Sequence, residues 1–272
     1  MIDIRSLLCC PVCKGKLNKE LQCLHCDRKY HSKDGIFIMV DPKLSKNEWK
    51  WDRRHFDPEE QEETANKYKG YLNEVTLKAQ EQWWEGMKPY IKSFRGYVLD
   101  IATGLGRMFR TLMKTDADFI PICSDVDPNV LAWIVKQIQC EYSKEFGALV
   151  TDAKHLAIKD EHLDVVTSCA GLNNIPDSAL AVQEIYRALK KAGKLVSMES
   201  FVDENSGSAE LAKQYHVEGS FIENNLIKKL ESVGFKDIKV KTVASAIWAR
   251  NPMDLLPIAG DEIRYVVIEA RK

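Results

Sequence analysis

The chain has 272 residues, of which 45% are hydrophobic and 29% are charged, as in an ordinary globular protein of one or two domains. Its formal net charge of −1 gives no global field that would attract nucleic acid or an anionic membrane. No apolar run is long enough to span a bilayer, and the first residues lack the layout of a signal peptide, so we expect a cytoplasmic protein. In that reducing compartment its eight cysteines favour metal binding over disulfides.

The first 40 residues contain two C-x-x-C pairs. Cys10 and Cys13 form one pair and Cys23 and Cys26 the other, with nine residues between the inner cysteines. Each pair can close a tight knuckle, and two facing knuckles give the four-sulfur tetrahedron of a structural zinc site. The sequence therefore predicts one zinc ion on these four cysteines. Other readings are reduced cysteines without metal, an iron–sulfur cluster, or substitute ligands: Cys9, His25 and His31.

The stretch after the second knuckle reads as strand, turn and strand over residues 30–39, with Asp34-Gly35 at the turn. Together with Leu7 to Cys13, its Tyr-x4-Gly-Ile-x-Ile-Met ending resembles the zinc ribbon of small activator proteins that partner transfer-RNA and other methyltransferases. The resemblance implies that residues 1–40 form a separate zinc ribbon.

Residues 41–95 are polar and mostly helical in pattern, and we expect a linker that caps a cofactor site. The charged stretch 46–63 has a helix start at Asp57-Pro58, and Leu72 to Phe94 has the spacing of an amphipathic helix. Four aromatic residues either line that cap or pack the helix onto the core: Tyr68, Tyr71, Trp83 and Trp84.

A nucleotide-site pattern follows at residues 97–114. Tyr97 to Ile101 reads as a buried strand, residues 102–106 as a turn of small residues, and Arg107 to Lys114 as a helix. Such a turn lets a ligand approach the backbone and the free N–H groups of the helix start. Phe109 stands where a dinucleotide fingerprint needs its third glycine, which disfavours that class. The remaining alternative is a βα turn that binds nothing.

The pattern Asp100-x-Ala102-x-Gly104-x-Gly106 resembles motif I of class I S-adenosylmethionine (SAM) methyltransferases, with alanine at the usual first glycine. The later segments are similar to the type 11, UbiE-like group of that family. The resemblance implies a Rossmann-like α/β fold, a seven-stranded sheet flanked by helices, over residues 96–272. Five residues of the motif would then hold SAM: Asp100, Ala102, Thr103, Gly104 and Gly106.

Three further stretches carry the remaining expected cofactor contacts. Phe119 to Ser124 reads as a strand that ends at Asp125, about 20 residues past the turn, where a ribose wants a carboxylate. Ser124 to Pro128 resembles the family's Asp-x-Ser-Pro stretch, with Asp127 as a helix cap. The resemblance makes Asp152 the acid near the adenine amino group, although it could instead only cap a helix. The predicted contacts are Asp125, Val126, Asp152, Ala153 and Cys169.

The segment 169–177 should pass near the transferable methyl group, with Asn174 where many relatives have histidine. The rest of the domain reads as helix 181–190, a tight return at 191–194, strand 195–199, a helix near 221–233, and strands 238–243 and 265–268. Residues 202–220 suit a lid, and the apolar segment 244–262 suits a pocket wall.

No catalytic base is identified. The candidates are more typical of surface or structural positions: His55, His216, Glu199 and Glu204. We expect a small-molecule O-, N- or C-nucleophile as acceptor. The alternatives are RNA, as in methyltransferases of ribosomal RNA guanine, a protein substrate, or a non-catalytic scaffold that docks a partner through the ribbon. An exocyclic base amine is disfavoured by resemblance because the Asn/Asp-Pro-Pro-Tyr/Phe motif is absent.

Overall fold

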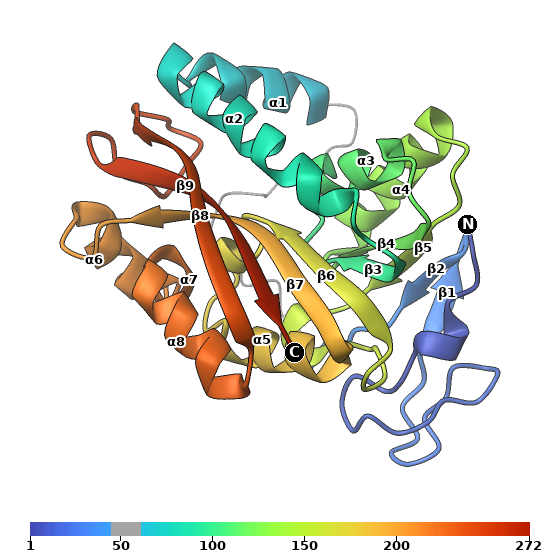
Figure 1. The fold of residues 1–272 in the computed structure, drawn as a ribbon. Coiled ribbons are helices and arrows are strands. Elements are labelled where there is room, and N and C mark those ends of the chain that lie inside the picture. The colour runs from blue at the N-terminus through green and yellow to red at the C-terminus, as the bar shows by residue number, and fades with distance from the viewer. Residues whose placement is uncertain (45–60) are drawn as a thin grey trace.

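The computed structural model describes residues 1–44 and 61–272. Within them a nine-stranded sheet has the order β1-β2-β5-β4-β3-β6-β7-β9-β8 (Figure 1). The strands are β1 His31–Lys33, β2 Ile36–Ile38, β3 Gly96–Asp100, β4 Phe119–Asp125, β5 Gly147–Val150, β6 Leu163–Cys169, β7 Leu189–Val202, β8 Lys236–Ile247 and β9 Glu262–Arg271. The helices are α1 Gln61–Gly70, α2 Glu74–Ile91, α3 Arg107–Lys114, α4 Pro128–Glu141, α5 Ala179–Ala188, α6 Gly207–Gln214, α7 Glu218–Phe221 and α8 Glu223–Val233.

Strands β3 to β9 form the seven-stranded, Rossmann-like sheet that the family resemblance implies. Strands β3, β4, β5, β6 and β7 run parallel, whereas β9 is antiparallel to both β7 and β8. The strand order reverses beside β3, because the chain moves from β3 outward to β4 and β5, then returns to β6. Ligands of such sheets bind at the carboxyl ends of the strands next to this reversal.

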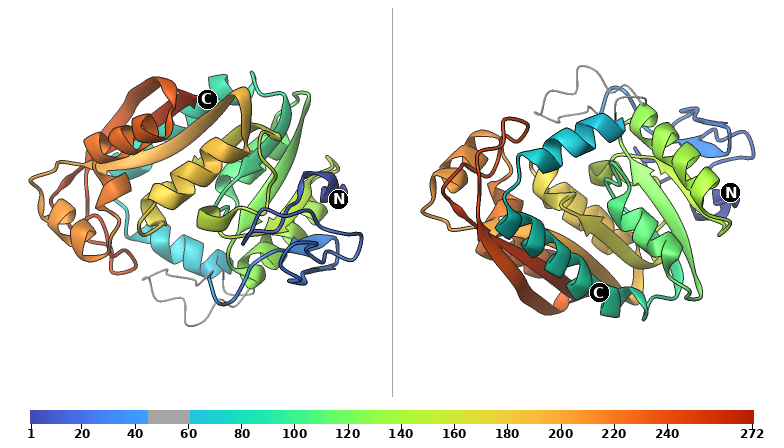
Figure 2. Two further views of the ribbon diagram at one scale, coloured as in Figure 1. Left: turned by 90° about the horizontal axis from the view of Figure 1, so that it is seen from below. Right: turned by 90° about the horizontal axis from the view of Figure 1, so that it is seen from above.

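Helices cover both faces of the sheet (Figure 2). One hydrophobic core holds the apolar sides of α2, α3 and α4, and the other holds those of α5 and α8. Side chains of β3 alternate between the two faces of the sheet and so contribute to both cores: Val98 belongs to the first and Leu99 to the second. Trp83 of α2 is buried: its indole N–H donates to the Val266 carbonyl at 2.6 Å, and its ring lies 4.9 Å from that of Tyr265. Trp83 is therefore a core residue.

Strand β7 begins earlier than expected. Leu189 pairs with Leu163, and after a register shift the pairing resumes between Lys194 and Val165. The predicted return at 191–194 is instead an irregularity within one long strand, with Ala192 at φ 63°. The local Ala-Gly signal marks a real distortion, but tertiary pairing keeps both sides of it in the sheet.

The N-terminal residues extend the same sheet. Strands β1 and β2 form the expected hairpin, and β2 pairs in parallel with β5 through Phe37–Leu149 and Ile38–Val150. Met39 continues this edge by donating its N–H to the Val150 carbonyl at 2.9 Å. We call residues 1–40 the cysteine module. Among the described helices, none combines the length and apolarity needed to cross a membrane.

Candidate functional site

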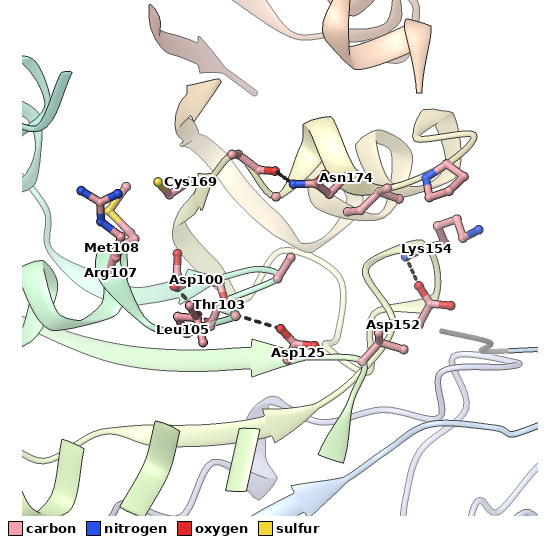
Figure 3. Close-up of a pocket in the computed structure, with 17 residues that line it drawn as sticks. Asp100, Thr103, Leu105, Arg107, Met108, Asp125, Asp152, Lys154, Cys169 and Asn174 are labelled. Carbon is pink, nitrogen blue, oxygen red and sulfur yellow. Dashed lines mark hydrogen bonds between the residues drawn. The ribbon is translucent and has the colours of Figure 1, made fainter. Parts of the chain in front are cut away.

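A cavity of about 230 Å³ opens at the carboxyl ends of β3, β4, β5 and β6 (Figure 3). Asp100 ends β3, Asp125 ends β4 and Cys169 ends β6, while Asp152 follows the end of β5. In Figure 3 the three carboxylates lie along one side of the cavity, and Cys169 and Asn174 along the other. Four chain segments far apart in the sequence thus meet because parallel strands end at one edge.

Asp100 lies buried beneath the turn. Its two carboxylate oxygens accept hydrogen bonds from Thr167 Oγ1 at 2.9 Å and from Thr103 Oγ1 at 3.0 Å. Burial raises the pKa of Asp100 to about 7 from its ordinary 3.8, although both hydroxyl donors act to lower it. The site therefore holds a carboxyl that changes charge near neutral pH.

The turn from β3 to α3 depends on left-handed backbone. Ala102, Gly104 and Gly106 have φ values of 47°, 53° and 76°. A Cβ at Gly106 would come within 2.2 Å of Ile134 Cδ1, so this glycine permits α3 to pack against α4. Gly106 therefore has a packing role and does not line the cavity, in contrast to the other predicted motif residues.

The other two carboxylates differ in how they are held. Asp125 accepts hydrogen bonds from the Gly104 N–H at 2.9 Å and the Asp127 N–H at 3.1 Å. Asp152 is buried, and its Oδ1 accepts from the Lys154 N–H at 2.8 Å. Its Oδ2 is also buried and has no hydrogen-bond partner among the described residues. Asp152 is thus both the cap of a short 3-10 helix and a free acceptor at the cavity.

Most of the predicted cofactor residues surround this cavity: Asp100, Ala102, Thr103, Gly104, Asp125, Val126, Asp152 and Cys169. Gly106 and Ala153 are not among its lining residues. Outside the 169–177 segment, the motif comparison missed four lining side chains: Leu105, Arg107, Met108 and Lys154. Each directly follows or lies within two residues of a predicted one, so the signal was adjacency to the motif; which side chains turn inward depends on the turn geometry.

A polar cluster borders the cavity at Arg107. The Arg107 guanidinium lies over the Trp84 ring, 5.0 Å from its centroid. Trp84 Nε1, the Tyr265 hydroxyl and Asp254 Oδ2 are buried without hydrogen-bond partners among the described residues. Burial raises the pKa of Asp254 to about 6, and burial followed by the charge of Asp254 raises the pKa of Tyr68 above its usual range. We call Tyr68, Trp84, Arg107, Asp254 and Tyr265 the Arg107 cluster.

The three candidate bases within the described residues do not line the cavity. His216 and Glu204 are exposed, and His55 lies outside the described residues. Glu199 is fully buried, and its Oε2 accepts from the Asn173 N–H at 3.2 Å. Burial raises the pKa of Glu199 to about 8. Its contact with residue 173 gives it a structural role beneath the 169–177 segment.

The four expected zinc ligands converge in the cysteine module. One Sγ from each lies within 4.8 Å of the others: Cys10, Cys13, Cys23 and Cys26. The closest sulfur pairs are 3.4, 3.4 and 3.7 Å apart, near the edge of about 3.8 Å that a zinc–sulfur distance of about 2.3 Å gives a tetrahedron. The substitute ligands Cys9, His25 and His31 are not part of this cluster.

Comparisons with known proteins agree with this geometry. Residues 99–197 match the family model Methyltransf_11, a methyltransferase domain. The chain is 28% identical over 140 residues to the ubiquinone/menaquinone biosynthesis C-methyltransferase UbiE of Rickettsia prowazekii, covering 50% of this chain and 56% of that protein. It is 30% identical over 139 residues to demethylmenaquinone methyltransferase of Lactobacillus johnsonii, covering 50% and 57%. The chain thus spans about half the length of these curated relatives.

The fold is also similar to that of a solved methyltransferase. Phosphoethanolamine N-methyltransferase 2 of Haemonchus contortus, solved in complex with S-adenosyl-L-methionine, aligns with a TM-score of 0.54 at 18% identity. The alignment covers 69% of this chain and 51% of that one, and at this identity it shows the fold alone. Residues 99–197 therefore match a methyltransferase domain, and the chain shares the Rossmann-like fold of a solved methyltransferase.

Proposed function

We propose that this chain transfers a methyl group from SAM to a small-molecule nucleophile. The observation that carries the cofactor assignment is Asp152, whose buried Oδ2 lacks a partner among the described residues. A buried acceptor of this kind is costly unless a ligand supplies a donor, and the adenine amino group is such a donor. Asp125 ends β4, the strand next to β5, and its carboxylate suits the ribose hydroxyls. Asp100 contributes negative charge for a cationic cofactor.

The chemistry asks little of the protein beyond positioning. SAM, when bound, supplies a methyl group already activated by the sulfonium. The chain orients the reactants and excludes water, and orientation alone is worth up to ~7–11 kcal/mol in favourable cases. A general base is needed only when the nucleophile carries a proton that must leave.

We propose that the acceptor binds beside the Arg107 cluster. Arg107 lines the cofactor cavity, and the cluster combines three aromatic rings with buried polar atoms that lack partners among the described residues. Apolar walls with a few polar groups are typical of small-molecule sites. The names of the relatives also favour a small acceptor over RNA. In the cysteine module seven Lys/Arg against four Asp/Glu is a small excess for RNA binding.

The cofactor assignment is tested by Asp152→Ala, measured by calorimetric titration with SAM. Loss of a charge-assisted hydrogen bond, about 1.5–3 kcal/mol, weakens binding roughly 10- to 150-fold. The matched control is Asp118→Ala, an exposed carboxylate just before the amino end of β4, which should bind SAM as the wild type does. Equal SAM affinity in the wild type and Asp152→Ala would refute the assignment.

The acceptor class is tested with methyl-labelled SAM and size-fractionated cell extract. Label in the low-molecular-weight fraction supports the proposal. Label that is found only with RNA and is lost on ribonuclease treatment would refute it, as would label confined to protein. SAM binding without transfer to any fraction would favour the non-catalytic scaffold.

We also infer that the four clustered cysteines hold one structural zinc ion, making residues 1–40 a zinc ribbon like that of the activator proteins. The sulfur spacing supports this, and all four cysteines are free of disulfides. Residues 41–95 would then be the linker and cap, and 96–272 the catalytic domain. Free thiols suit a reducing compartment such as the cytoplasm.

A further inference from the structure

The cysteine module is hydrogen-bonded to one segment that follows strand β5, residues 151–160. The Cys9 N–H donates to the Ala157 carbonyl at 3.0 Å, and the Lys159 N–H donates to the Leu7 carbonyl at 2.9 Å. Between them, Leu8 and Ile158 form an antiparallel bridge. The backbone just before the first C-x-x-C knuckle is therefore hydrogen-bonded to residues 157–159, five to seven residues after Asp152.

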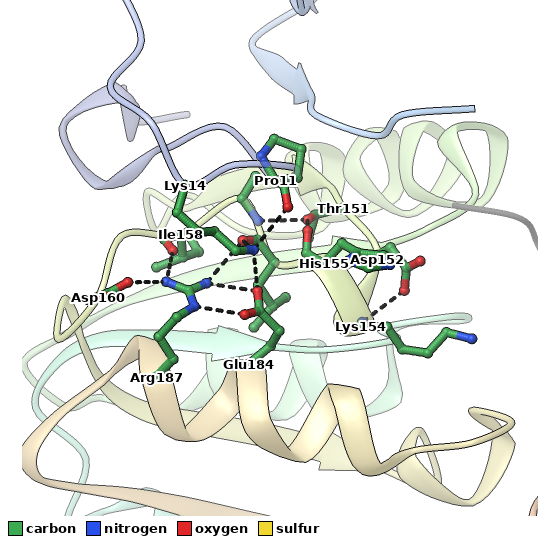
Figure 4. Close-up of polar contacts among 12 residues, drawn as sticks. Pro11, Lys14, Thr151, Asp152, Lys154, His155, Ile158, Asp160, Glu184 and Arg187 are labelled. Carbon is green, nitrogen blue, oxygen red and sulfur yellow. Dashed lines mark hydrogen bonds and ion pairs between the residues drawn. The ribbon is translucent and has the colours of Figure 1, made fainter. Parts of the chain in front are cut away.

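An ion cluster reinforces the same junction (Figure 4). Lys14, the residue after Cys13, forms an ion pair with Glu184 of α5 and donates to the Leu156 carbonyl at 3.1 Å. Arg187 binds Glu184 through two N–H groups at 2.8 and 2.9 Å. Arg187 also donates to the carbonyls of Ile158 at 2.7 Å and Leu156 at 3.2 Å. The module, the segment and α5 are thus held together by one cluster.

The side chains of this cluster are largely shielded from water. Exposed fractions are 29% for Lys14, 14% for Glu184 and 19% for Arg187. Burial acts to raise the pKa of Glu184, but hydrogen bonds from Arg187 and Lys14 outweigh it, so the pKa is lowered. The carboxylate is therefore kept ionised between its two cations, and removal of one partner leaves buried charge uncompensated.

The same segment carries the cofactor contacts. The Ala157 N–H donates to Thr151 Oγ1 at 3.0 Å, and the Thr151 N–H donates to the Asp125 carbonyl at 2.9 Å. Within the segment, the His155 N–H donates to the Asp152 carbonyl at 2.9 Å. A short series of hydrogen bonds therefore runs from Cys9 to the backbone of Asp125, and the same segment holds the backbone of Asp152.

We propose that Lys14, Glu184 and Arg187 are positioning residues through which the cysteine module sets the affinity of the cofactor site. They fix Leu156 and Ile158, and hence the placement of Asp152, without touching the cofactor cavity themselves. The inference rests on the proposed SAM-binding function and goes beyond it, because it assigns the module a role in cofactor binding. A module that only stabilised the fold would not change affinity in the folded protein.

The test uses the full chain and S-adenosylhomocysteine, the demethylated product, as the calorimetric probe. Glu184→Gln keeps the shape but removes the charge, and we expect affinity to fall about tenfold. Lys14→Met removes the cation that pairs with Glu184, and we expect a similar fall in affinity. The double variant should bind no more weakly than either single variant. Lys14→Arg should restore most of the affinity, because it keeps the cation.

The matched control is Lys190→Met. Lys190 also forms a partly buried ion pair, with Asp164 at 2.8 Å, but at the opposite end of the strands. Melting temperature and amide hydrogen exchange of residues 154–157 are measured on every variant. A lower melting temperature in Glu184→Gln and Lys14→Met with unchanged probe affinity would overturn the inference and leave the proposed function standing. A wild-type chain that binds neither SAM nor the probe would refute both.

Discussion

SAM affinity should depend on pH through Asp100. The carboxyl is buried, and its pKa is raised to about 7 by that burial. Relative to its ordinary value of 3.8, this corresponds to on the order of 4 kcal/mol against the ionised form. Because the folded pKa is raised, the protonated carboxyl is favoured in the empty site, and ionisation opposes folding increasingly as the pH rises from about 4 to 7.

A cation in the cavity reverses this preference. SAM carries a sulfonium, an ammonium and a carboxylate, so its net charge is +1, and a net positive charge on the order of 6 Å from Asp100 would contribute roughly 3 kcal/mol at an effective dielectric of about 20. That energy lowers the pKa of Asp100 by about 2 units in the complex, so binding releases a proton near neutral pH. SAM affinity therefore rises between about pH 5 and 7 and levels off above, with a total change approaching 100-fold.

The assay is calorimetric titration from pH 5 to pH 8, repeated at pH 7 in buffers of different ionisation enthalpy. At pH 7 roughly half a proton should leave for each SAM bound. Asp100→Asn should flatten the pH profile and abolish the proton release, and S-adenosylhomocysteine, which lacks the sulfonium, should show a shallower profile. A wild-type affinity that is constant from pH 5 to 8, or an unchanged profile in Asp100→Asn, would refute the reasoning.

Two further predictions follow from the site and the module. Elemental analysis of reduced protein should give about one zinc per chain, reduced by Cys13→Ser but not by Cys140→Ser on the exposed side of α4; metal-free protein with an intact fold would contradict the zinc assignment. Ala102→Gly should raise the free energy of unfolding by about 0.5–1 kcal/mol in urea denaturation, because Ala102 has a φ of 47°. Ala181→Gly, inside α5, should lower it by about 1 kcal/mol or more, and a loss of stability in Ala102→Gly would show that the left-handed backbone is not the dominant factor.

Local patterns in the sequence were enough for much of the fold. The apolar spacing after the small-residue turn predicts a helix over Arg107 to Lys114, and α3 has these bounds. The strand that ends at Asp125 is likewise observed as β4. Both predictions rest on short-range periodicity, which is a strong signal where one face of an element is buried. The two C-x-x-C pairs are likewise recognised from local sequence, because each knuckle is closed by residues three positions apart.

Long-range pairing lay beyond these patterns. No signal in residues 36–38 specifies a partner more than 100 residues away, yet β2 pairs with β5. The predicted lining of the cavity is also incomplete. Arg107 and Lys154 line the cavity because of the geometry of their turns, which the sequence pattern does not specify. Aromatic residues in α2 had two readings, and only packing separates the buried Trp83 from Trp84 beside Arg107.

The hairpin at the sheet edge also bears on aggregation. Strand β5 is buried along its whole length, whereas the outer strand β1 consists of three exposed residues, one of them Lys33. Short, charged edge strands discourage pairing between molecules, and long apolar ones invite it. A fragment that begins after residue 40 would expose the open hydrogen-bonding edge of Leu149 and Val150. Such a fragment should self-associate through that edge.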